Sequence, residues 1–239
     1  MENLLIIGGC HFVNDDFIKQ LKEKFKYKKV RKIFTHISEQ SFSKSLEFIH
    51  HEKEYLKDNK YDIYFQLGNL LFHNSISNIL PKYFNKFIPN NINSDLIQTD
   101  NNIRDIKKSY KVILSNILRK VLKVLVFPLN IIYVPFKGFQ SYNQIKKILI
   151  DDELINNNIF IYTPFYSPNY TDKFFRFIGK KIIYILFSDI NNITIINLTD
   201  EKFDKSEFND NDIYHLNTNG MNHLMNYIFE KIEQKIQLY

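Results

Sequence analysis

Short runs of branched apolar residues alternate along the chain with segments in which apolar residues recur every three or four positions. The apolar runs predict five strands, at residues 3–7, 28–34, 61–67, 159–163 and 193–198. The periodic segments predict helices at about 15–25, 42–59, 105–127, 142–150, 173–187 and 218–236. Strands and helices that alternate at this spacing imply right-handed crossovers, so we expect an α/β protein with a central, mostly parallel sheet.

The polar stretches between these elements suggest how the chain is divided. Residues 74–103 are rich in asparagine and predict a loop-rich insertion. Pro128 and Pro135 are expected to end the helical pattern that precedes them, so the loop-rich and helical insertion spans about 74–135. Residues 199–211 and 212–217 predict loops before the last helix. Because no repeat or flexible linker is present, we expect a single domain over residues 1–239.

Composition narrows the class of protein. The 239 residues are 44% apolar and 24% charged, which is ordinary for a globular protein. Abundant lysine, asparagine, isoleucine and phenylalanine indicate an AT-rich genome, so the net charge of +6 does not by itself indicate an anionic partner. No nucleic-acid-binding module is visible, and we expect no nucleic acid partner. One cysteine, no leader and no transmembrane run together predict a soluble, cytoplasmic protein.

The predicted 105–127 helix has one apolar face and one face rich in lysine and arginine. A basic amphipathic helix of this kind can lie on an anionic membrane. The simpler interpretation is a helix that packs on the sheet and turns its lysines to solvent. We adopt the simpler interpretation here.

Residues that could take part in catalysis stand at three places, each at the end of a predicted strand or before the last helix. The first strand runs into Gly8-Gly9-Cys10, near the start of a helix, where the helix dipole favours a thiolate. The third strand ends in Gly68-Asn69, and a third group, Asp212 to Asn217, precedes the last helix. The carboxyl ends of parallel strands share one edge, so Cys10 and His215 can meet there. In a tight turn, Asp212 could reach one nitrogen of His215 and orient the ring.

These blocks resemble the SGNH, or GDSL-like, hydrolase superfamily along essentially the whole chain. Gly8-Gly9-Cys10 occupies the place of the family's Gly-Asp-Ser block, and the 37–41 loop matches its second block. Leu67-Gly68-Asn69-Leu70 matches the Gly-X-Asn block, and Asp212 to His215 is an intact Asp-X-X-His block. The resemblance implies a three-layer α/β/α sandwich of flavodoxin-like topology.

The resemblance also implies an activity and its residues. Cys10, His215 and Asp212 would form a catalytic triad that acts through an acyl-enzyme, with cysteine in place of the family's serine. Gly68, Asn69, Gly9 and His11 are the candidate oxyanion or substrate-binding residues. Two departures bear on the oxyanion site, because Glu39 stands near the family's second-block glycine and Asn69 comes one place early, before Leu70.

Several functions stay open at this point. An esterase, a thioesterase or an O-acetyltransferase of bacterial polysaccharide modification would act on a small-molecule or glycan ester or thioester. No cofactor is required, although an acyl-CoA could be a co-substrate, and the histidine spacing predicts no metal site. The alternatives are a catalytically decayed binding protein of the same fold, or a CoA-dependent polysaccharide acetyltransferase of another family. The acyl group, the acceptor and the oligomeric state are left open.

Overall fold

The computed structural model describes residues 3–9, 11–12, 14–34, 60–68, 110–150, 157–166, 170–209 and 212–236. Within these ranges the side chains at 33–34, 110–120, 122–124, 171, 212–214 and 236 are not described. The predicted loop at 36–41, the predicted helix at 42–59 and the predicted loops at 74–103 lie outside the described residues.

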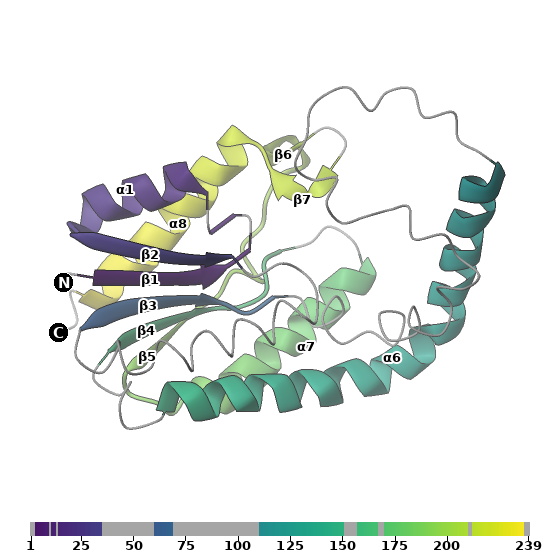
Figure 1. Cartoon of the computed structure of the whole chain (residues 1–239), viewed down its shortest axis with the longest axis horizontal. Coiled ribbons are helices and arrows are strands. Elements are labelled where there is room, and N and C mark those ends of the chain that lie inside the picture. Colours follow the sequence, from purple (N-terminus) through teal and green to yellow (C-terminus); the bar gives the residue numbers. More distant parts are fainter. Residues whose placement is uncertain are drawn as a thin grey trace.

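The five predicted strands form one parallel sheet. They are β1 (Asn3–Gly8), β2 (Lys29–Phe34), β3 (Tyr61–Gln66), β4 (Asn158–Tyr162) and β5 (Ile193–Ile196). Their order is β2-β1-β3-β4-β5, and every neighbouring pair is parallel (Figure 1). The predicted α/β class and the central five-stranded sheet are therefore confirmed.

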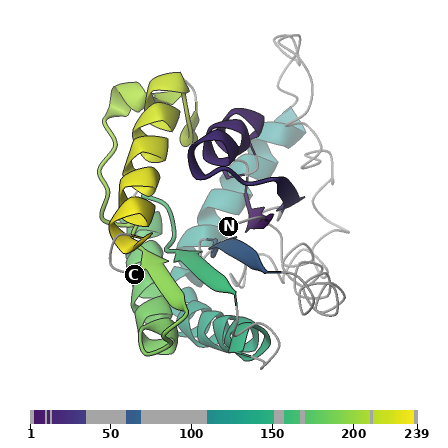
Figure 2. The ribbon, with the colours of Figure 1, turned by 90° about the vertical axis from the view of Figure 1, so that its left-hand side faces the viewer.

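Helices lie on both faces of this sheet. α1 (Asp15–Phe25) and α8 (Thr218–Ile236) cover one face, and α6 (Tyr110–Ile150) and α7 (Tyr170–Phe187) lie against the other (Figure 2). Side chains along β1 alternate between the two faces. Leu4 and Ile6 pack with α1 and α8, whereas Leu5 and Ile7 pack with α6 and α7. Burial on both faces explains why the central strands β1 and β4 are nearly continuous apolar runs.

α1 begins where its sequence provides a cap. The Asn14 side-chain oxygen accepts hydrogen bonds from the backbone N–H groups of Asp16 (2.8 Å) and Phe17 (3.4 Å). These donors have no partner within the helix itself, so the cap stabilises its first turn. Asn14 is therefore the N-cap residue of α1.

α6 corrects the prediction of two separate helices at 105–127 and 142–150. One helix runs from Tyr110 to Ile150, through both Pro128 and Pro135, and it bends along its length (Figure 1). A proline removes one backbone donor and kinks a helix, but packing of the flanking turns can carry the helix across it. Val126, Val134 and Tyr142 lie on one side of α6 and are all buried, which provides that packing.

The segment after β5 is more ordered than predicted. The region predicted as loops at 199–217 contains the 3₁₀ helix η2 (Lys205–Glu207) and two short strands, β6 (Phe208–Asn209) and β7 (Asp212–Leu216). β6 and β7 pair antiparallel, with Phe208 opposite Leu216. These apolar residues are both buried, so this small sheet closes over the core rather than forming an exposed loop.

A buried polar network links the segment between α1 and β2 to the sheet. The Tyr27 hydroxyl donates to Asp62 Oδ2 (2.6 Å), and Asn158 Nδ2 donates to Asp62 Oδ1 (2.9 Å). Burial raises the pKa of the Asp62 carboxyl, and these two hydrogen bonds oppose that effect. The carboxylate is therefore held in the core by donors that offset part of its desolvation.

Candidate functional site

The carboxyl edge of the sheet is where this topology favours a binding crevice. The chain passes from β1 to β2 on one side of β1, and then from β2 to β3 on the other side of β1. In doubly wound sheets, ligands bind at such a switch point. In this chain the switch point lies between the ends of β1 and β3, next to Gly9 and Gln66.

The turn after β1 leaves little room for a side chain at Gly8. A Cβ on Gly8 would lie 3.0 Å from Phe12 Cβ and 3.2 Å from Gln66 Cβ. The Gly9 N–H donates to Gln66 Oε1 (2.8 Å), and the Phe12 N–H donates to the Gly9 carbonyl (3.0 Å). Neither glycine has a positive φ, so close approach rather than backbone conformation favours glycine at position 8, whereas a Cβ on Gly9 would lie in ordinary contact with Gln66 Oε1 (3.4 Å). Cys10, inside this turn, lies outside the described residues.

Gln66 is a site residue that the sequence reasoning missed. It is the last residue of β3, and its side chain joins the switch-point strands by accepting from the Gly9 N–H. The available signal was a single polar residue at the end of an otherwise buried strand, directly before Leu67-Gly68. The Gly9 amide is thus already paired within the protein.

His11 joins the turn after β1 to the segment before α8. Its ring stacks on Phe165, at 5.1 Å between ring centroids, and on His215, at 5.7 Å. His11 Nε2 accepts a hydrogen bond from the Leu216 N–H (3.3 Å), which assigns the proton of a neutral ring to Nδ1. Residues about 200 positions apart therefore meet at this edge, whereas the contact of Cys10 with His215 stays a prediction.

His215 lies on a strand and not in the tight turn that its spacing from Asp212 suggested. β7 is extended from Asp212 to Leu216, and the His215 side chain is partly exposed. The prediction of a tight turn at Asp212 to His215 was therefore wrong. That turn was the reason for expecting the Asp212 carboxylate to contact the His215 imidazole. Of Asp212, only the backbone is described, and its pairing with His215 stays a prediction.

The start of α8 fixes the position of β7. The Asn217 side-chain oxygen accepts from the N–H groups of Asn219 (3.0 Å) and Gly220 (3.2 Å), which caps the helix. Its amide nitrogen donates to the Ser206 carbonyl (2.6 Å) and the Phe208 carbonyl (3.1 Å). One asparagine thus ties η2, β6 and α8 together directly after the candidate base.

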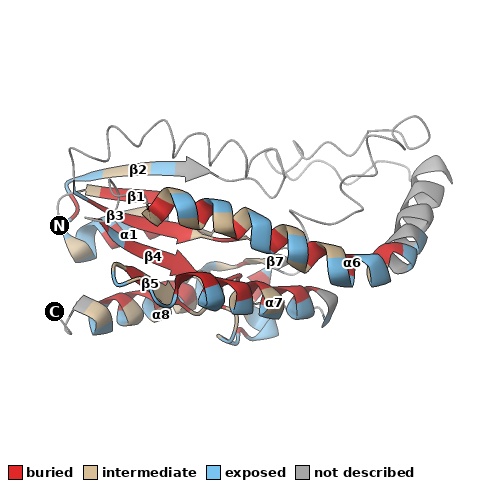
Figure 3. Cartoon of the chain, turned by 90° about the horizontal axis from the view of Figure 1, so that it is seen from below, coloured by how far each residue is buried: buried red, intermediate tan, exposed pale blue. Residues whose placement is uncertain are grey.

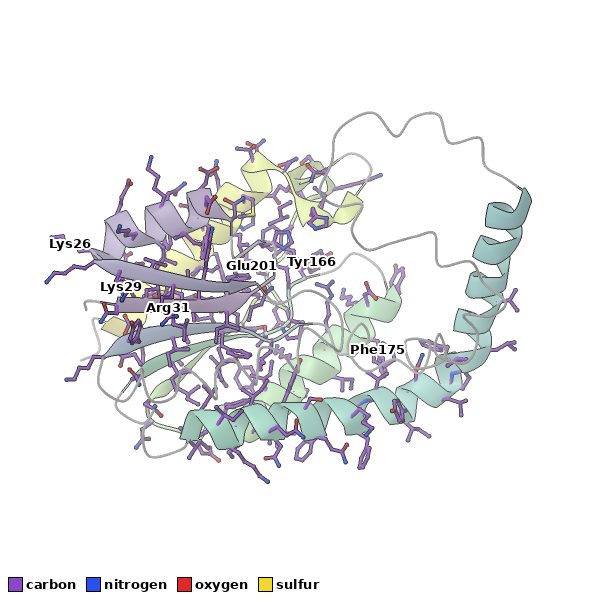
Figure 4. The ribbon with its side chains drawn as sticks, in the orientation of Figure 1. Lys26, Lys29, Arg31, Tyr166, Phe175 and Glu201 are labelled. Carbon is purple, nitrogen blue, oxygen red and sulfur yellow. The ribbon has the colours of Figure 1, made fainter. Side chains whose placement is uncertain are left out.

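The loops after β4 and β5 support Phe165 beneath His11. Thr163 Oγ1 accepts from the Leu198 N–H (2.8 Å), and Thr199 Oγ1 donates to the Pro164 carbonyl (2.7 Å). From α7, buried Arg176 donates to the carbonyls of Phe165 and Tyr166. Figure 4 shows Tyr166 at this carboxyl end of the sheet and Lys29 at the opposite end.

A second histidine cluster adjoins this edge. His223 on α8 contacts Glu207 Oε1 through Nδ1 (2.7 Å) and Glu201 Oε1 through Nε2 (3.0 Å). Partial burial disfavours the charged ring, but the hydrogen bonds and the attraction of the two carboxylates outweigh it and raise the pKa of His223. Within the described ranges, no group of three or more His, Cys, Asp or Glu side chains has a geometry that could hold a metal ion.

The remaining predicted residues fall into two groups. Gly68 lies at the end of β3, where its carbonyl accepts from the Tyr142 hydroxyl of α6 (2.8 Å). Asn69 and Glu39 lie outside the described residues. The structure thus brings Gly9, His11 and His215 to one edge and leaves Cys10 and Asn69 undescribed. No protein-family model, curated protein or solved structure matches this chain.

Proposed function

We propose that the protein is an acyl-transfer enzyme, an ester or thioester hydrolase or an acyltransferase, in which Cys10 is the nucleophile and His215 the base. The observation that supports this most directly is the stacking of His11 on His215 at 5.7 Å. His11 follows Cys10 in the chain, and Gly9 precedes it at the switch point. The two candidate reacting groups therefore belong to segments that contact each other.

The proposed chemistry proceeds in two steps. His215 takes the Cys10 thiol proton, and the thiolate adds to the acyl carbonyl to give a tetrahedral intermediate. When that intermediate collapses, the alcohol or thiol leaving group departs with the proton from His215, and the acyl group stays on sulfur. Water or an acceptor hydroxyl, deprotonated by His215, then releases the acyl group and the thiolate. Asp212 would orient the imidazole and stabilise its charged form.

The oxyanion of the intermediate needs donors that are not already used. The Gly9 N–H donates to Gln66, so we assign this role to the N–H groups of Cys10 and Gly68, with the Asn69 side chain as a third donor. An acyl-CoA fits as the acyl donor because thiolates exchange readily with thioesters. A glycan hydroxyl is the acceptor that the family resemblance implies.

We also propose the finer fold assignment, a three-layer α/β/α sandwich of the SGNH type. The strand order and the helices on both faces support it. The same strand order occurs in doubly wound proteins of unrelated function, so the chemistry depends on the site residues rather than on the fold.

A binding protein without catalysis is the second candidate. The extended backbone of β7 favours it, because the tight turn expected to bring Asp212 onto His215 is not present. In that case the crevice would hold an ester or glycan without forming an acyl-enzyme.

Intact-protein mass spectrometry separates the two candidates. Wild-type protein incubated with a panel of acyl-CoA and aryl esters should gain one acyl mass, and Cys10→Ala should gain none. The rate of Cys10 alkylation by iodoacetamide near neutral pH should fall about tenfold or more in His215→Ala. The matched control is His223→Ala, which removes another ring at this end of the molecule and should leave the rate unchanged. A Cys10 that reacts like a free thiol in all three proteins would contradict the proposed activation.

A further inference from the structure

The described hydrophobic side chains that remain exposed are concentrated on one side of the molecule. All of the large ones belong to α6 or α7: Val121, Leu125, Leu129, Ile131, Ile132, Phe136, Phe139, Tyr170, Phe174, Phe177, Tyr184 and Ile185. Seen from below, these two helices lie side by side against the sheet, and both have exposed surface (Figure 3). We call the outward sides of α6 and α7 the α6/α7 face. Apolar patches of this kind mark interaction sites.

On α6 the exposed residues form one stripe. Leu125, Leu129, Ile132, Phe136 and Phe139 are separated by four, three, four and three positions, which places them on one side of a helix. Their exposed fractions run from 43% to 77%. The inward side of the same helix is apolar and buried at Val126, Val134, Tyr142, Ile145 and Leu149. α6 is therefore apolar on two sides, although only its inner side has a partner among the described residues.

α7 continues the same surface. Tyr170 (89% exposed), Phe174, Phe177 and Tyr184 lie on its outward side, together with Ile185. The charges interspersed among them are basic and exposed, at Lys173 and Lys181. Lys181 Nζ lies 5.5 Å from the centroid of the Phe177 ring. A lysine that lies along an aromatic ring keeps its charge at the edge of an apolar surface.

The charge of this face has one sign. The α6 sequence contains no Asp or Glu, and its basic residues are Lys111, Arg119, Lys120, Lys123, Lys137, Lys146 and Lys147. The only acidic residue of α7 is Asp172, which is buried. The opposite layer differs, because exposed α1 residues carry both signs, for example Asp16 and Lys19, and among the described side chains of α1 and α8 no large apolar one is exposed. Coding bias toward apolar residues would not by itself leave every exposed large apolar side chain of the described residues on α6 and α7.

We propose that the α6/α7 face binds the surface of an anionic lipid bilayer, with both helices lying in the plane of the membrane. Apolar side chains that insert among lipid tails, lysines at the headgroups and tyrosines at the boundary are the composition that an interfacial site requires. A second copy of the chain fits less well, because pairing two such faces would bring lysines together with no carboxylates to oppose them.

The proposed membrane site differs from the basic 105–127 helix considered in the sequence analysis. It lies largely on other residues, and membrane binding now replaces the simpler interpretation adopted there. The described apolar stripe extends along α6 from 121 to 139 and continues onto α7, beyond the segment considered from sequence. It does not depend on the proposed catalysis. No helix within the described ranges is long and apolar enough to cross a bilayer.

Vesicle flotation tests the proposal with the full-length protein. Vesicles of phosphatidylcholine that contain phosphatidylglycerol should carry the wild-type protein upward, and vesicles of phosphatidylcholine alone should carry far less. Lys173→Glu with Lys181→Glu should lower the partition coefficient about tenfold or more, since each basic residue near an anionic leaflet contributes measurably to binding. Ile132→Ser with Phe136→Ser should lower it similarly through lost insertion. The matched control, Lys19→Glu with Lys22→Glu on α1, makes the same change in net charge on the opposite layer and should bind nearly as well as wild type.

Four results would overturn the proposal. The first is wild-type protein that floats with neither vesicle. The second is an equal loss of binding in the α1 control, which would mean that net charge and not this face binds the lipid. The third is a wild-type dimer that the Ile132→Ser and Phe136→Ser variant converts to a monomer, because a second copy would then cover the face. The fourth is a large fall in melting temperature in that variant, which would mean that another part of this chain covers it.

Discussion

Gly220→Ala tests whether the contact between α8 and η2 is as close as the structure has it. Alanine normally stabilises a helix relative to glycine, by about 1 kcal/mol at an interior position. At position 220, however, a Cβ would lie 2.3 Å from the Glu207 carbonyl oxygen and 2.8 Å from Leu216 Cδ2. That carbonyl also accepts from the Asn217 N–H (2.9 Å), so it cannot move away without weakening this bond. The substitution therefore sets a local gain against a tertiary clash.

We expect the steric clash to outweigh the gain in helix propensity, so that Gly220→Ala lowers the free energy of unfolding. Overpacking costs about 1–3 kcal/mol, and a contact of 2.3 Å with a backbone oxygen belongs in the upper part of that range, at about 2–3 kcal/mol. Subtracting the helical gain of about 1 kcal/mol leaves a net loss of about 1–2 kcal/mol in the free energy of unfolding. For a chain of this length that loss corresponds to a melting temperature lower by about 2–8 °C. Differential scanning calorimetry of wild type and variant measures the difference directly.

Asn226→Ala is the matched control on the same helix. Its side chain is exposed, so the change adds helix propensity without a clash and should raise the melting temperature slightly. If Gly220→Ala matches or exceeds that rise, then α8 does not approach Glu207 as closely as described, and the argument about how β7 is positioned fails with it.

Three further substitutions test the fold through single interactions. Asn14→Ala removes the cap of α1 and should cost about 1 kcal/mol in urea denaturation, whereas an unchanged midpoint would contradict the capping role. Tyr27→Phe removes a 2.6 Å hydrogen bond to buried Asp62 and should cost about 1.5–3 kcal/mol near neutral pH. Because the loss of that donor raises the pKa of Asp62 further, the cost should shrink in acid, where the carboxyl is protonated; a cost independent of pH would contradict this. His223 has its pKa raised above 6.5 in the folded state, so its charge stabilises the protein below that pH and the contribution is lost as pH rises through the folded pKa. His223→Gln should therefore destabilise the protein by up to about 1 kcal/mol near pH 5.5 and have little effect near pH 9, and the opposite trend in thermal melts would refute the assignment.

The strands were predictable because each is encoded within a few neighbouring residues. The runs at 3–7 and 61–67 are apolar, branched or aromatic, and bounded by turn residues, which leaves little choice but a buried strand. The start of α1 was predictable for the same reason, since Asn14 followed by two acidic residues is a local capping signal.

The two errors arose where packing overrides a local signal. Pro128 and Pro135 predict breaks, yet α6 continues because its inner side is buried against the sheet and α7. Residues 212–217 contain polar residues typical of a loop, yet β7 forms because Leu216 is buried opposite Phe208. The residues that bury α6 are far from the two prolines in sequence, and β7 depends on pairing with a second short segment that by itself also resembles a loop.

For the site, the sequence alone identified which residue types stand at the strand ends, and the order of the strands and helices implied that these ends share one edge. Only the tertiary structure decided that His11 stacks on His215, that Gln66 pairs with the Gly9 amide, and that the outward sides of α6 and α7 together form one apolar, basic face. The physical reason is the distance along the chain over which each signal acts. Strand and cap signals depend on a few neighbouring residues. Side-chain contacts at the sheet edge, and the exposure of a helix face, depend on residues that are close in space but distant in sequence.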